Sequence, residues 1–254
     1  MNPIDRPIPF SVIRLCGAIL LALAVFLSGC AAAGRPVPAS LPEGDAALDS
    51  GSAGENAWWR ARFRFVWPED EDPRWFLDLL AADHLIKPIL VRHRHRIGLW
   101  RFHRRAVRDA AGHQFSFLFY SDRDTARQIF SEIRADPLIA ELCAAGQLDE
   151  MVLDDPGGEL DTDIAATSDP NWSAALRSAW PYYIMGVSGL WLELIHQAAD
   201  GVSPPTDSTQ ALLDYYRDLD FRVNDVWRDE AHHAFFHHLN AIFGYRPLMI
   251  RKLM

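Results

Sequence analysis

Four histidines lie within seven residues near the C-terminal end of the sequence, beside acidic side chains. Glu230, His233 and His237 follow one another at spacings of three and four residues, which places them in one line on a helix. Two imidazoles one helical turn apart can hold one metal ion, and Glu230 would add a carboxylate. The glutamate that follows the first histidine of metalloprotease helices is replaced by Ala234, and a further ligand would have to come from another element, with His196 the nearest. The cluster therefore has two interpretations: a metal site, with Zn as its cofactor, or half-exposed histidines bonded to neighbouring acids.

A second cluster is the basic run over residues 92–108, where seven arginines and three histidines precede any acidic side chain. If this stretch is extended, alternate residues share one face of a strand. The run then predicts an anion-binding site for a phosphate or an acidic peptide. Its members would be Arg92, Arg94, Arg96, Arg101 and Arg105. The alternative is that these arginines pair with the protein's own carboxylates.

No complete catalytic pattern accompanies these clusters. The sequence has no glycine-rich phosphate loop and no G-x-S-x-G segment. Cys143 lies in an apolar helical context and is expected to be a buried small side chain rather than a nucleophile. We therefore predict no catalytic residue.

Composition restricts the class of protein. The chain has 254 residues and a formal net charge of -9, with 49% apolar and 23% charged residues, as in a globular chain. An acidic chain is poorly suited to nucleic-acid binding, which needs a basic surface. Three cysteines cannot form a disulfide framework for a chain of this length.

The first 30 residues have the features of a secretory signal. Two arginines precede an uncharged apolar run over residues 15–26, which is too short for a permanent membrane span. The run ends in Leu27-Ser28-Gly29-Cys30, which resembles the lipobox of bacterial lipoproteins. The resemblance implies cleavage of the signal peptide (1–29) and attachment of acyl chains, palmitate among them, to Cys30. It also implies a membrane anchor that faces the periplasm, and because Ala31 and not aspartate follows the cysteine, the outer membrane is favoured. The alternative is an uncleaved apolar anchor.

The chain after Cys30 divides into a tether and a folded region. Residues 30–57 are rich in Ala, Gly, Pro, Ser and Asp, which is typical of a flexible tether. Residues 58–254 are expected to form a single α+β domain.

Period-two and helical patterns predict the order β-α-β-β-α-β in the first half of that domain. The expected elements are a strand at 59–67, a helix at 73–86, an extended stretch from residue 88, a hairpin at 99–120, helices at 123–134 and after residue 137, and a strand at 151–153. This order indicates a ferredoxin-like sandwich. Two long C-terminal helices are expected to follow, one over residues 169–201 that is buried and broken near Pro181, and one from Thr206 or Ser208 to Gly244.

Three short segments resemble motifs of the C-terminal, glutamate-eliminating domain of lantibiotic dehydratases and their thiopeptide relatives. They are Trp100-Arg101-Phe102-His103-Arg104, His113-Gln114-Phe115-Ser116-Phe117, and residues 237–244. The resemblance implies a related fold. Two arginines of that family fall on Phe115 and Phe117, and a third on Ala241, so elimination activity is not implied.

Together these features predict a membrane-anchored lipoprotein with a binding or envelope-structural role and a periplasmic protein or peptide partner. The alternative is a metal-binding protein or metal-dependent enzyme that uses the C-terminal histidines.

Overall fold

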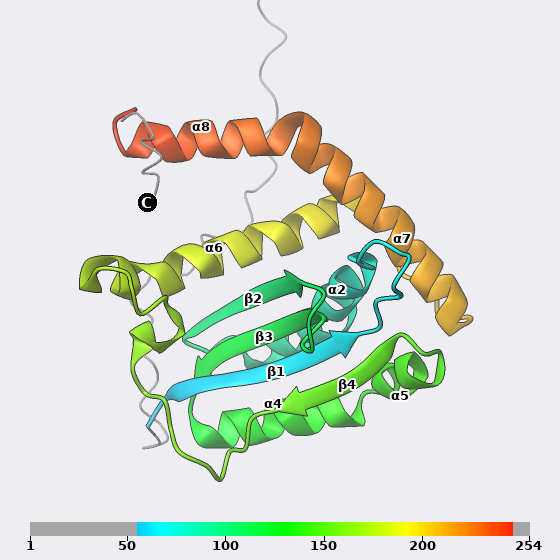
Figure 1. The fold of residues 1–254 in the computed structure, drawn as a ribbon, viewed down its shortest axis with the longest axis horizontal. Helices are drawn as coiled ribbons and strands as arrows, with labels where there is room; N and C mark the ends of the chain where they lie inside the picture. The colour runs from blue at the N-terminus through cyan, green and yellow to red at the C-terminus, as the bar shows by residue number, and fades with distance from the viewer. Residues whose placement is uncertain (1–54, 246–254) are drawn as a thin grey trace, which may run out of the picture. The chain divides into compact units, whose positions relative to one another are not determined.

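The computed structural model describes residues 55–245. They form a four-stranded antiparallel sheet with helices, and the predicted α+β class is confirmed (Figure 1). The predicted signal peptide, Cys30 and most of the predicted tether lie outside the described residues.

The strands follow the order that alternation in the sequence predicts. They are β1 (Ala57–Phe65), β2 (Leu99–Ala106), β3 (His113–Ser121) and β4 (Leu148–Leu153). Their order across the sheet is β2-β3-β1-β4, and each neighbouring pair is antiparallel. β2 and β3 form the predicted hairpin, while β1 begins at Ala57, one residue before the predicted domain boundary.

The two faces of the sheet differ in chemistry because successive side chains of a strand point to opposite sides. One face is aromatic and fully buried, with Phe63 of β1 and Phe115, Phe117 and Phe119 of β3 at its centre. Edge-to-face and tilted ring pairs connect these side chains to the helices, as between Phe119 and Phe130 at 5.6 Å. The opposite face is polar and is the face turned toward the viewer in Figure 1.

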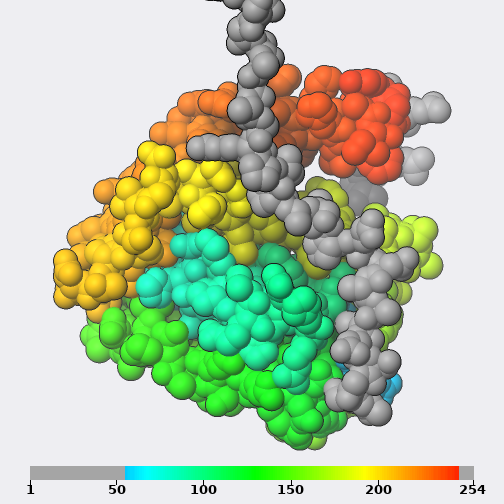
Figure 2. Space-filling view, turned by 180° about the vertical axis from the view of Figure 1, so that it is seen from behind, coloured from blue at the N-terminus to red at the C-terminus, as the bar shows by residue number. Residues whose placement is uncertain are grey.

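Helices cover the aromatic face. They are α2 (Phe76–Leu80), the π-helix η1 (Ala81–Ile86), α3 (Lys87–His93), α4 (Arg123–Ala135) and α5 (Pro137–Ala144). Figure 2 looks onto this side, where residues 76–144 make up the teal and green surface. Asp122 caps α4 by accepting a hydrogen bond from the backbone N–H of Thr125, which confirms the predicted helix start.

The prediction of an extended chain from residue 88 is wrong, because the helix continues to His93. Pro88 has no N–H and normally interrupts an α-helix. Here it follows a π-helical turn in which the N–H of Lys87 donates to the carbonyl of Ala82, five residues back. The hydrogen-bond ladder is already offset at this point, so the proline is accommodated.

The helix α6 (Ala174–Ala198) lies beside β2. Ser188 of α6 accepts a hydrogen bond from the backbone N–H of Phe102 at 3.0 Å, so this helix occupies the outer edge of β2. Only four residues of α6 are buried. The predicted helix is therefore confirmed, but its buried and broken character is wrong.

Ser168 explains why α6 is unbroken. Proline at position 181 leaves the carbonyl of Arg177, four residues earlier, without its helical donor. The hydroxyl of Ser168 donates to that carbonyl at 2.8 Å and replaces the missing N–H. Ser168 directly follows a short 3-10 helix, η2 (Ile164–Thr167), and is buried.

The last predicted helix is confirmed, with an interruption that periodicity does not predict. It consists of α7 (Thr209–Val226), the π-helix η3 (Trp227–Ala231) and α8 (His232–Ile242). Ser208 caps its start, and Gly244, with φ at +72°, lies just after its end. Between residues 55 and 245, none of the helices has both the length and the apolar character that a membrane crossing requires.

β4 forms the other edge of the sheet. The pairing between β1 and β4 shifts register between Arg64 and Phe65, which marks a β-bulge. Asp149 and Glu150 of β4 pair with Arg64 of β1 at 2.8 and 3.2 Å. This edge therefore combines a bulge with two acidic side chains.

Cys143 is exposed, so the prediction of a buried thiol is wrong. The buried side chains of α5 are Leu138 and Leu142, which lie one helical turn apart. Cys143 is the next residue and points about 100° away from that buried line.

Candidate anion-binding site

The polar face of the sheet carries cations in three consecutive rows. In each row a residue of β3 lies between a β1 residue and a β2 residue. The rows are Arg60-Leu118-Arg101, Arg62-Ser116-His103 and Arg64-Gln114-Arg105. Because neighbouring strands lie about 4.8 Å apart, the two outer members of a row are separated by about 10 Å at the backbone. We call these nine residues the arginine trough.

The Arg64-Gln114-Arg105 row is neutralised by the protein itself. Arg64 pairs with Asp149 and Glu150, and Arg105 pairs with Asp109 in the turn after β2. The guanidinium of Arg105 also holds the pKa of Asp109 at about 2. This end of the trough has little charge to offer a ligand.

The row at the other end is different. Within residues 55–245, Arg60 forms no ion pair, and Arg101 makes one side-chain hydrogen bond, to the backbone carbonyl of Thr167 at 3.1 Å. In the middle row Arg62 approaches Asp154 at 3.6 Å, which is a long contact for an ion pair. The two guanidinium groups of Arg60 and Arg101 therefore face the trough without a carboxylate partner in the described part of the chain.

A hollow of about 470 Å³ lies over these two rows. Its floor includes Leu118, Ser116 and Gln114, and Ser116 is only 5% exposed. Its far side comes from the end of η2, the segment after it and α6, and consists of Ala166, Thr167, Ser168, Asp169, Trp172 and Trp180. The hollow is thus built by residues from five separate parts of the chain.

The hollow ends at a small apolar cluster of Trp58, Leu99 and Leu118, against which Ile164 and Met185 pack. The indole N–H of Trp58 donates to the carbonyl of Ile164 at 3.1 Å, which attaches η2 to the sheet. Both tryptophans at the start of β1, Trp58 and Trp59, are buried.

Burial and mutual repulsion shape the charges in the trough. Burial lowers the pKa of Arg101, and the positive charge of Arg60 lowers it further. Burial likewise lowers the pKa of His103, with smaller contributions from Arg101 and Arg105. An anion placed between these groups would counter the lowering of both pKa values.

Several polar atoms around the hollow are buried without a partner among the described residues. They are the Nε atoms of Arg62 and Arg101 and the hydroxyl of Thr167. Buried donors in native proteins are nearly always satisfied by protein, water or ligand. The pattern is that of a site built to receive acceptor oxygens.

The structure separates the arginines that the sequence grouped together. Arg101 and Arg105 lie in the trough, whereas Arg92 lies on α3 and Arg94 and Arg96 lie in the turn after it. Arg92 is 3.5 Å from Glu132, and Arg96 is 3.7 Å from Asp122 and also bonds Gln128. The shared strand face expected for these three is therefore wrong, and the alternative of self-pairing applies to Arg92 and Arg96.

Arg60 and Arg62 are site residues that the sequence-based prediction does not include. Their alternation on one face of a strand was visible, but not the pairing of that strand beside β3, which brings them opposite β2. Trp172, Trp180 and the segment around Ser168 had no signal in the sequence beyond a turn and a helix start.

The residues of the predicted metal site lie on η3 and α8. His233 and His237 are both exposed, with ring centroids 6.1 Å apart, and Glu230 lies in the π-helical turn. Within residues 55–245, no three His, Cys, Asp or Glu side chains are placed to hold one metal ion.

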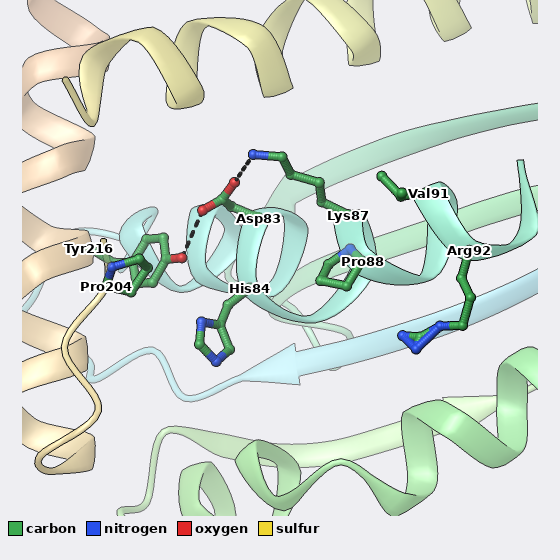
Figure 3. A pocket seen from close by; sticks show the side chains of 8 residues that line it. All are labelled: Asp83, His84, Lys87, Pro88, Val91, Arg92, Pro204 and Tyr216. Atoms are coloured by element: carbon green, nitrogen blue, oxygen red, sulfur yellow. Dashed lines mark hydrogen bonds and ion pairs between the residues drawn. The ribbon is translucent and has the colours of Figure 1, made fainter. Parts of the chain in front are cut away.

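A second hollow lies between η1, α3 and α7, and Figure 3 shows the eight residues that line it. Asp83 is at its centre and is fully engaged, because it accepts from the hydroxyl of Tyr216 and pairs with Lys87, both at 2.8 Å. Burial, and then the charge of Asp83, raises the pKa of Tyr216. This hollow of about 760 Å³ is larger than the hollow of the trough. Its central carboxylate is neutralised, however, and the hydrogen bond to that carboxylate connects α7 to η1.

A buried polar network lies on the aromatic side of the sheet. Asp78 of α2 is fully buried and contacts His113 at 3.0 Å and Arg104 at 2.8 Å. The guanidinium of Arg104 also lies over the rings of Trp75 and Trp191, at 4.8 and 4.7 Å from their centroids. Because the carboxylate is shared between α2, β2 and β3, we assign this network to structure.

Comparison with known proteins gives no match: no family model, no curated protein and no solved structure is similar to this chain at a significant level. The function must therefore be argued from the site itself. The residues that align with the eliminating family's arginines, Phe115 and Phe117, are fully buried on the aromatic face.

Proposed function

We propose that this protein is a membrane-anchored bacterial lipoprotein that binds an anionic ligand in the arginine trough. Acyl chains on Cys30 hold it on the membrane, and the outer membrane, facing the periplasm, is its location. The folded unit has a binding role, and its ligand is an anionic group of a periplasmic small molecule, peptide or protein. A purely envelope-structural role, which the sequence leaves open beside a binding role, does not account for the open trough.

One observation carries the binding role. Arg60 and Arg101 face the same hollow, and neither has a carboxylate partner within residues 55–245. In a chain with a net charge of -9, acidic partners are plentiful, and most other arginines of the basic run have found one. Two unpaired cations that face each other across a hollow raise the electrostatic free energy of the folded protein unless an anion lies between them.

We also infer that the first half of the folded unit has the ferredoxin-like β-α-β-β-α-β topology. The strand order β2-β3-β1-β4 with antiparallel neighbours, and helices gathered on one face, support this. In such an arrangement the face without helices is free for a ligand, and here that face holds the trough.

The anchor is tested by growing cells with radiolabelled palmitate and isolating the full-length chain. We expect label in the wild type and none in Cys30→Ala. Cys143→Ala, which removes the exposed thiol, is the matched control and should keep the label. Label that survives in Cys30→Ala would overturn the lipobox assignment.

Anion binding is tested by titrating the full-length protein in neutral detergent with inorganic phosphate, pyrophosphate and an oligoglutamate peptide. At least one of them should bind, and Arg101→Gln should weaken that binding about tenfold or more. Arg94→Gln, an exposed arginine of the same basic run outside the trough, is the matched control. Equal affinity in all three proteins, or no binding to any anion, would refute the proposal.

A second candidate function rests on the exposed pair of His233 and His237, one helical turn apart. Such a pair can hold a metal ion with a third ligand from elsewhere. Metal analysis of tag-free protein is the test: about one equivalent of zinc that is lost in His233→Ala would establish it. Metal-free, folded protein would leave these histidines as surface residues.

A further inference from the structure

The charge in the trough restricts the kind of anion. Arg60 and Arg101 contribute two positive charges that no described carboxylate offsets, while Arg62 is already near Asp154. Asp169, the one acid that lines the hollow, is exposed, and its carboxylate accepts from the backbone and side-chain N–H groups of Asn171 at 2.8 and 3.0 Å. A dianion matches this pair of guanidinium groups better than a monoanion does, since each unbalanced charge must otherwise be offset by solvent.

The donors of the trough suit tetrahedral oxygens. Guanidinium groups approach the ligand space from two opposite strands, and the hydroxyls of Ser116 and Thr167 lie on the floor and on the far side. A carboxylate is satisfied by one guanidinium fork, whereas the three oxygens of a terminal phosphate can accept from several directions at once. Charge and donor placement together indicate a phosphate monoester.

The far side of the hollow is aromatic. Trp172 and Trp180 form an edge-to-face pair with centroids 4.9 Å apart, and Tyr183 continues the aromatic surface 5.5 Å from Trp180. Both tryptophans are only partly buried, so ring surface remains open to the hollow. Inorganic phosphate would leave these rings uncovered, whereas a ring carried by the ligand could pack on them.

We propose that the arginine trough binds a sugar phosphate, with the phosphate between Arg60 and Arg101 and the sugar ring against Trp172 and Trp180. This inference rests on the proposed function, because it names the ligand class of the same site. The class includes free sugar phosphates and nucleotides as well as phosphorylated sugars on lipid head groups.

The test compares ligands that contain one or both parts. Full-length protein in neutral detergent is titrated by calorimetry with inorganic phosphate, glucose, glucose 6-phosphate and adenosine monophosphate. We expect glucose 6-phosphate or the nucleotide to bind at least about tenfold more tightly than inorganic phosphate, and glucose alone not to bind. Arg101→Gln should weaken every phosphate-containing ligand.

The tryptophans separate this inference from the proposed function. Trp180→Ala should weaken the sugar phosphate about tenfold and leave inorganic phosphate unchanged. Trp67→Ala is the matched control, because that ring contacts Arg108 at 4.0 Å and does not line the hollow. Trp172→Ala, which removes the other ring, serves as the second variant if Trp180→Ala does not fold.

Each outcome has a definite meaning. One outcome is that phosphate binding depends on Arg101, but affinity does not rise with the sugar and does not fall in the tryptophan variants. This outcome would overturn the sugar-phosphate inference and leave anion binding intact. Absence of any phosphate binding would overturn the sugar-phosphate inference, and anion binding would be overturned as well if the oligoglutamate peptide also failed to bind. Competition by vesicles that carry a phosphoinositide, and not by phosphatidylcholine vesicles, would assign the sugar phosphate to a lipid head group, and no competition would assign it to a free molecule.

Discussion

At the scale of single residues, the side chain of His103 is a direct probe of the trough, because it is a titratable group placed between Arg101 and Arg105. Burial and these two charges lower its pKa in the folded protein. Protonation therefore favours the unfolded chain, where the pKa is about 6.5.

We expect the wild type to lose stability relative to His103→Gln as the pH falls below about 6.5, and the two to respond alike above it. Urea unfolding at pH 5 and pH 7.5 measures this difference. If the free energies of unfolding of the two proteins change equally between pH 5 and pH 7.5, the charges around His103 do not lower its pKa.

A second residue-scale prediction concerns Asp78, which was not distinguished in the sequence and lies fully buried between Arg104 and His113. Its replacement leaves the half-buried guanidinium of Arg104 and the buried ring of His113 without their shared carboxylate, so Asp78→Ala should lower the free energy of unfolding by about 3–5 kcal/mol. Asp109→Ala, which removes the exposed partner of Arg105, should change stability far less. Urea denaturation of both variants is the measurement, and comparable losses would argue against a structural role for the buried network.

At the scale of elements, the sequence predicts the type and order of nearly every helix and strand, because alternation and helical periodicity are local properties. It fails where a feature without a periodic pattern compensates for a helix-breaking proline. Pro88 follows a π-helical turn, and Pro181 is compensated by Ser168, thirteen residues earlier in the chain. Neither compensation has a periodic signature.

The candidate site is only half predictable for the same reason. The alternation of cations in β2 identifies Arg101 and Arg105, but the trough needs a second set of cations from β1. Their juxtaposition depends on β3 lying between the two strands, which is a property of the strand order. The aromatic side of the hollow depends in turn on the path of the chain from η2 into α6.

The link between Ser168 and Pro181 gives an element-scale prediction. Ser168→Ala leaves the carbonyl of Arg177 without a donor and should cost about 1–3 kcal/mol of unfolding free energy. In a Pro181→Ala background the new backbone N–H can donate to that carbonyl, so the same serine replacement should cost much less. A double-mutant cycle by urea denaturation measures the coupling between the two positions. An equal cost in both backgrounds would mean that the hydroxyl of Ser168 does not support α6.

At the scale of the whole molecule, an acidic chain carries one cationic face. The net charge of -9 would repel anionic lipid head groups, so the proposed acyl chains and not surface charge would hold the protein on a membrane. The trough, in contrast, would bind its ligand through charge.

These two attachments should respond to salt differently. Raising NaCl from 0.1 to 1 M shortens the screening length from about 10 to about 3 Å, so phosphate affinity should fall while the membrane-bound fraction stays constant. Membrane flotation and ligand titration at both salt concentrations measure the two quantities. Release of the wild type by 1 M NaCl would indicate electrostatic rather than lipid attachment.

The bulged, acidic strand β4 has a consequence for proteins held on a surface. Copies held in one leaflet by the proposed acyl chains would diffuse in two dimensions and collide often, and an unpaired strand edge favours side-by-side association of sheets. Two β4 strands meeting in antiparallel fashion would bring the acidic pairs of Asp149 and Glu150 from both copies toward each other, while the bulge at Arg64 and Phe65 spoils the register. With α6 along the edge of β2, lateral fusion is opposed at both ends of the sheet. Even at high surface density, these molecules would therefore stay separate and mobile rather than join through their sheet edges.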